Sequence, residues 1–103
     1  MSAASEVEIE EIAIDGDGHL LVRPRLPAED DFAFIWRDAS GIRWNETARA
    51  LVAAEPQRWE GFNLYKQILA AVQSEYGKRL IVTAATRWSG VRNDLKERIQ
   101  ASA

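Results

Sequence analysis

Tryptophan and arginine are the residue types in this chain that most strongly suggest a binding chemistry. Each of the four tryptophans has an arginine neighbour, in the pairs Trp36-Arg37, Arg43-Trp44, Arg58-Trp59 and Arg87-Trp88. Guanidinium groups and aromatic rings together can hold a base, a peptide or a ring-shaped anion by stacking and cation–π contacts. The alternative is a set of core tryptophans with outward arginines, because adjacent strand residues point to opposite faces.

The best candidates for such a surface flank a short turn at Ser40-Gly41. This turn would place Trp36 and Trp44 on neighbouring strands, with their Cβ atoms about 5 Å apart. The positively charged Arg37 and Arg43 would then lie together on the opposite face. Two like charges this close need a carboxylate, a ligand or a partner protein. The predicted binding residues are Trp36, Arg37, Arg43, Trp44 and Trp88.

Other site chemistries find little support. The chain has no cysteine, which excludes disulfides, thiolate zinc sites and cysteine nucleophiles. The single histidine, His19, is expected at the surface, with a general acid or base role as the alternative. The run Asp15-Gly16-Asp17-Gly18 lacks the later glycine and glutamate of a calcium loop, so it predicts a hairpin turn. We expect no metal, no cofactor and no catalytic residue, and we favour a non-enzymatic protein over an enzyme.

Composition bounds the class of protein. A chain of 103 residues is expected to form a single domain, residues 1–103, with residues 1–5 disordered. The formal net charge of −3 argues against a general nucleic-acid binder. The sequence contains neither a secretory signal nor an apolar run of the roughly 20 residues that a membrane span needs. We therefore expect a soluble cytoplasmic protein without membrane contacts.

A long helix is the clearest element that would position these residues. Apolar residues at helical spacing predict a helix that begins near Glu60 or Gly61 and ends at Tyr76, where Gly77 supplies a left-handed cap. The following segments are predicted as a strand at 80–83 in the sheet interior, a loop at 84–90 that holds Trp88, and a short helix capped by Asn93 or Asp94.

The first half of the chain predicts the sheet. Val7 and Ile9 share one strand face while Ile12 and Ile14 share the other, so we expect a bulge near Glu10-Glu11 or a later strand start. The return strand at 20–22 ends at Pro24, which suggests an edge position. Further strands are predicted at 32–37, 42–44 and 48–53, the last with a helix as the alternative.

These elements predict an α+β domain. Its mainly antiparallel sheet has about five strands, a hairpin plus a meander, and is packed by one long helix, with a short helix at the C-terminus.

Several short segments resemble those of small integron gene cassette proteins. The resemblance covers about residues 32 to 91 and is carried by Phe34-Ile35-Trp36-Arg37, Gly41-Ile42-Arg43-Trp44, Tyr65-Lys66-Gln67-Ile68, Ala71-Val72, Glu75-Tyr76-Gly77 and Leu80-Ile81-Val82-Thr83. It implies a mobile, accessory α+β protein that forms homo-oligomers. No catalytic residue carries over from this resemblance.

Three functions are compatible with the sequence. The first is a small non-enzymatic binding or interaction protein that self-associates as a homodimer or higher oligomer and can take a protein partner. The second is an immunity or antitoxin-like protein with an acidic surface, formed by Glu6, Glu8, Glu10, Glu11 and residues 29–31. The third is a small-ligand-binding domain or enzyme that uses the arginine and tryptophan surface.

Overall fold

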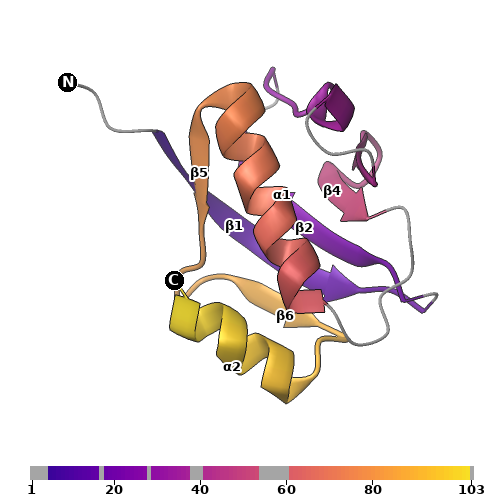
Figure 1. The fold of residues 1–103 in the computed structure, drawn as a ribbon, viewed down its shortest axis with the longest axis vertical. Coiled ribbons are helices and arrows are strands. Elements are labelled where there is room, and N and C mark those ends of the chain that lie inside the picture. The colour runs from indigo at the N-terminus through magenta and orange to yellow at the C-terminus, as the bar shows by residue number, and fades with distance from the viewer. Residues whose placement is uncertain (1–4, 17, 28, 38–40, 54–60, 103) are drawn as a thin grey trace.

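The computed structural model describes residues 5–16, 18–27, 29–37, 41–53 and 61–102. A curled sheet is packed by helices that lie on one of its faces (Figure 1). The strands are β1 (Ser5–Ile14), β2 (Leu20–Pro24), β3 (Ile42–Asn45), β4 (Ala50–Ala53), β5 (Lys78–Ile81) and β6 (Arg87–Ser89). The helices are η1, a 3-10 turn (Ile35–Arg37), α1 (Gly61–Tyr76) and α2 (Asn93–Ser102). The predicted α+β fold class, with one long helix and a short C-terminal helix, is confirmed.

The first strand is the centre of the sheet. The strand order is β3-β4-β2-β1-β5, and β6 pairs with the C-terminal half of β1 on the same side as β5. The pairs β1–β2, β2–β4 and β3–β4 are antiparallel, whereas β5 and β6 run parallel to β1. The sheet is therefore mixed, because the crossover through α1 brings β5 parallel to β1, and β6 continues in the same direction along the same edge of β1.

A bulge in β1 reconciles the two apolar parities of this strand. Its pairing with β2 shifts register between Ile9 and Glu11, which is the predicted bulge. The extra residue lets Val7, Ile9 and Ile12 all face the core, with exposures of 8%, 0% and 0%. The predicted hairpin turn after β1 is also present, where the Gly18 amide donates to the Asp15 carbonyl at 3.0 Å.

The prediction of a strand at residues 32–37 is wrong. This segment forms turns and η1, and the two buried side chains, Phe32 and Ile35, are spaced three residues apart as in a 3-10 helix. A strand would place Phe34 on the same face as the buried Phe32, but Phe34 is 50% exposed. The Asp31 carboxylate accepts a hydrogen bond from the Ala33 amide at 3.1 Å and so favours a turn.

The neighbour of β3 is consequently β4, not the preceding segment. The strand preferred over a helix at 48–53 is confirmed as β4 (Ala50–Ala53).

Three further expectations for the sheet need correction. The strand β5 lies at one end of the sheet, not in its interior, and Ile81 faces the side of the sheet that no helix covers. The strand β2 lies inside the sheet, and Pro24 is tolerated because the β4 pairing reaches only Leu21 and Val22. Trp88 lies in β6 and not in a loop, because residues 87–89 pair with β1.

The core lies between the sheet and α1, which crosses in front of β1 and β2 in Figure 1. Helix α1 spans the predicted residues and is followed by Gly77 with φ +65°, the expected left-handed position. Helix α2 adds the fully buried Ile99. The core-facing residues of α1 are Tyr65, Ile68, Ala71 and Val72. In the part of the chain that the structure describes, no helix is long and apolar enough to span a membrane.

Candidate functional site

The structure does not bring the predicted binding residues together. Trp36 belongs to η1 and not to a strand beside Trp44, so the expected cross-strand pair is wrong. The side chain of Trp36 lies outside the described part of the chain. Trp44 faces the core side of β3, where its ring meets the Phe32 ring edge-on at 5.8 Å. Arg43, the preceding residue, projects to the opposite face and is exposed.

The Trp44 ring belongs to a structural cluster around the β3–β4 turn. Its indole Nε1 donates to the Glu46 carboxylate at 2.6 Å, and the Arg49 guanidinium lies 5.4 Å from the ring centre. Arg49 also donates to the backbone carbonyls of Pro27 and Asp30. Its backbone has φ +54°, a conformation that favours glycine, so its side-chain contacts must offset that strain. The described contacts of Trp44 with Glu46 and Arg49 therefore stabilise the turn between β3 and β4.

The remaining predicted residues lie elsewhere. Arg37 forms an ion pair with Glu75 at 3.8 Å and lies over the Phe34 ring at 4.6 Å. Trp88 pairs with Ile12 and packs against the core below the Lys96 ammonium. The strands β4, β2 and β1 separate β6 from β3 in the sheet. A binding role for the five residues stays a prediction.

The sheet face opposite α1 offers a different candidate, which we call the open face. Strand register aligns its side chains in two rows across the sheet. The first row has an apolar centre between two polar ends and runs Arg43, Val52, Leu21, Ala13 and Ser89. The second row is more polar and has two paired parts, which are Asn45 with Ala50 and the run Arg23, Glu11 and Arg87. Sequence reasoning missed these rows, because they depend on which strands are neighbours.

Ion pairs along β1 neutralise most of the charge on the open face. Every glutamate of this strand lies within 4.0 Å of an arginine from a neighbouring strand or the chain just after β2. The pairs are Glu6–Arg79 at 4.0 Å, Glu8–Arg25 at 3.1 Å, Glu10–Arg87 at 3.3 Å and Glu11–Arg23 at 3.1 Å. The acidic stretch at the N-terminus is therefore not a free acidic surface.

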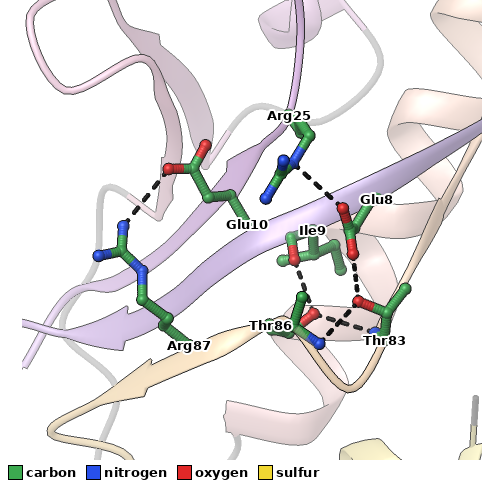
Figure 2. Close-up of polar contacts among 8 residues, drawn as sticks. Glu8, Ile9, Glu10, Arg25, Thr83, Thr86 and Arg87 are labelled. Atoms are coloured by element: carbon green, nitrogen blue, oxygen red, sulfur yellow. Dashed lines mark hydrogen bonds and ion pairs between the residues drawn. The ribbon is translucent and has the colours of Figure 1, made fainter.

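Figure 2 shows how the loop after β5 is joined to the bulged strand. The Thr86 hydroxyl donates to the Ile9 carbonyl at 2.6 Å and accepts from the Thr83 amide at 3.0 Å. The Thr83 hydroxyl donates to the Glu8 carboxylate, which also pairs with Arg25. Thr86 is 6% exposed, so these bonds satisfy polar groups that water does not reach. This network fixes the chain between β5 and β6, and we assign it a structural role.

A shallow hollow of about 380 Å³ adjoins the open face. Glu10, Arg23 and Arg49 are among the residues that line it. Both arginines already donate to protein oxygens, since Arg23 Nε bonds the Ala48 carbonyl at 3.1 Å and Arg49 bonds the Pro27 carbonyl. An anionic ligand would have to compete with these contacts, so the hollow is a weak candidate for a ligand site.

Two tyrosines have raised pKa values. Burial raises the pKa of Tyr65 to about 12. Burial also raises the pKa of Tyr76, whose hydroxyl oxygen accepts a hydrogen bond from the Phe34 amide at 2.9 Å. Both phenols therefore stay protonated at neutral pH. Among the described residues, no three histidine or acidic side chains are grouped so as to hold a metal ion.

Comparisons with known proteins identify the relatives of this chain. The sequence model of the family described as Integron Cassette Protein Hfx_Cass5 matches residues 7–86. A solved structure is titled "Structure from the mobile metagenome of North West Arm Sewage Outfall: Integron Cassette Protein Hfx_Cass5". Its chain is 34% identical, with 93% of each chain covered and a TM-score of 0.42. No curated protein matches the chain. The sequence identity, and not the superposition, carries the relationship.

Proposed function

The chain belongs to the Hfx_Cass5 family of integron cassette proteins, and we propose that it is a non-enzymatic interaction protein that forms a homodimer through its open face. The observation that carries this proposal is the composition of the face. It combines an apolar centre at Leu21, Ala13 and Val52 with paired charges around it. Leu21 and Ala13 are half-buried within the single chain, and Val52 is 8% exposed.

Charge supports a second copy as the occupant of this face. The four ion pairs along β1 leave the face nearly neutral, although the chain as a whole carries −3. Two copies can therefore approach face to face without strong repulsion. In a two-fold arrangement each arginine of one copy can also meet a glutamate of the other, because an isologous interface uses the same patch twice. Of the predicted binding residues, we propose only Arg43 for this interface.

The size of the molecule is also compatible with a dimer. Stable interfaces bury roughly 800 Å² on each partner. The molecule measures 37 × 26 × 22 Å, and Figure 1 views it down the shortest axis, from the side that α1 covers. The open face is therefore one of the two broad sides.

Sedimentation velocity of the wild type and two charge-introducing variants tests this proposal. We expect the wild type to sediment as a dimer at micromolar concentration and Leu21→Glu to sediment as a monomer. Phe34→Glu is the matched control, because it removes an exposed apolar residue from the turn just before η1, away from the open face. Circular dichroism would establish that both variants are folded.

A monomeric wild type at about 100 μM would overturn the proposal. Dimer loss in Phe34→Glu with a retained dimer in Leu21→Glu would also overturn it, because the interface would then lie elsewhere.

A further inference from the structure

A second surface lies at the margin of the sheet, along β5. This strand pairs with β1 on one edge, and no other described strand pairs with its second edge. Figure 1 shows β5 at the outside of the sheet, with α1 beside it and the end of α2 near its far end. A free strand edge presents a row of unpaired backbone N–H and C=O groups, which an additional strand can bind.

A hollow of about 260 Å³ follows this edge. It is lined by the four consecutive residues 79–82, by Tyr65 and Leu69 of α1, and by Ser102 of α2. Residues 79–81 belong to β5, and side chains of successive strand residues point to opposite faces, so three in a row can line one hollow only along the edge of the strand. The hollow therefore joins backbone groups of β5 to apolar side chains of α1.

The charge of this edge indicates which kind of strand fits it. The strand begins with Lys78 and Arg79 and continues with apolar residues. On its occupied edge it pairs with β1, where Glu6 lies beside Arg79 and Val7 beside Leu80. Arg79 is 61% exposed in its side chain, and its contact with Glu6 at 4.0 Å is the longest of the ion pairs along β1. A second carboxylate can therefore approach this guanidinium.

We propose that the free edge of β5 binds an extended peptide segment of a partner protein in which acidic and apolar residues alternate. The peptide adds a strand to the sheet, places an acidic residue near Arg79 and inserts an apolar side chain between α1 and β5. This inference does not rest on the dimer at the open face, because strand addition uses the backbone groups along the edge of β5, and Arg79 is the residue that the two surfaces share.

The probe is a fluorescently labelled, capped peptide with the sequence of residues 5–10, of which residues 5–8 already pair with β5 within the chain. We expect saturable binding in fluorescence anisotropy, with no binding of a peptide in which lysine replaces each glutamate. Two further peptides carry N-methyl groups on alternate residues, each blocking one edge of the peptide strand. Strand addition uses a single edge, so one methylated peptide should bind like the parent and the other should lose binding.

Arg79→Glu provides the test on the protein side. We expect it to weaken binding of the acidic peptide about two- to fivefold, as for an exposed ion pair, and to favour the lysine peptide. Arg92→Glu is the matched control, because it makes the same charge change at an exposed residue just before α2. It should leave both affinities unchanged.

Three results would overturn the inference. They are an acidic peptide that does not bind, equal binding or equal loss for the two methylated peptides, and a peptide that dissociates a wild-type dimer. The last result would mean that β5 pairs with a second copy. Loss of peptide binding with an intact dimer overturns this inference alone, whereas loss of the dimer in Leu21→Glu with intact peptide binding leaves it standing.

Discussion

The two faces of the sheet are built from the same strands but from opposite chemistry. On the covered face Ile9, Ile12 and Val22 are fully buried, and each contributes roughly 1.5–3 kcal/mol by leaving water. On the open face the same strands carry ion pairs between half-buried or exposed side chains, each of which contributes about 0–1 kcal/mol. The covered face therefore supplies most of the folding stability, and the open face can serve recognition with little effect on it.

The largest expected effect comes from truncating one apolar residue on each face. Ile12→Ala should lower the free energy of unfolding by about 2–5 kcal/mol, because the side chain is fully buried between sheet and helix. Leu21→Ala on the open face should lower it by less than about 1.5 kcal/mol in the monomer, because this side chain is only half-buried. Urea titrations measure the unfolding free energy of both variants, at protein concentrations too low for the dimer to form. Equal losses would contradict the division between the faces.

Alkaline pH tests the covered face through Tyr65. Tyr65 is 2% exposed, and its phenol has a pKa of about 12, against 10.0 for a free tyrosine. Because the folded-state pKa is raised, the stabilisation from the protonated phenol is complete below pH 10 and is lost as pH rises through 12. We expect a decrease on the order of 2 kcal/mol across this window.

Tyr65→Phe is the control for this pH profile. The unfolding free energy of this variant, measured by urea titration between pH 9 and 12, should fall less steeply with rising pH than that of the wild type. Tyr76 keeps part of the slope, because burial raises its pKa as well. Identical slopes for variant and wild type would contradict the assignment to Tyr65.

Thr86 tests the hydrogen-bond network that joins the loop after β5 to the bulged part of β1. Thr86→Val keeps the shape of the side chain but leaves the buried Ile9 carbonyl without its hydroxyl donor. We expect a loss of about 1–2 kcal/mol in unfolding free energy. Thr86→Ser keeps the hydroxyl and should retain a larger share of the stability than valine does. Calorimetry compares the stabilities of the wild type and the two variants. A valine variant as stable as the wild type would show that the Thr86 hydrogen bonds do not stabilise the fold.

Much of the fold could be predicted because periodicity and turn chemistry are local. The spacing of Tyr65, Ile68 and Val72 indicates α1, Gly77 its end, and the parity change between Ile9 and Ile12 the bulge. Errors arose where local patterns are ambiguous. Residues 32–37 alternate like a strand, yet the tertiary packing of Phe32 and Ile35 selects a 3-10 turn.

The open face could not be predicted from the sequence for a different reason. Its rows join Arg43 to Ser89 through three other strands, and this order follows from crossovers that no local pattern encodes. The same holds for the ion pairs. Glu10 meets Arg87 across 77 residues of sequence, so an acidic stretch and scattered arginines look unrelated until the strands are placed.

The smallest expected effect is on the open face itself, where Glu10→Gln removes the charge that pairs with Arg87 at 3.3 Å. The side chains of this pair are 37% and 62% exposed, so solvent and salt screen their attraction. We expect the unfolding free energy of the monomer to fall by less than about 1 kcal/mol, with the difference from wild type shrinking at 1 M salt. A larger, salt-independent loss would mean that the open face contributes to folding as the covered face does. A weaker dimer with unchanged monomer stability would instead indicate that these charges act in recognition.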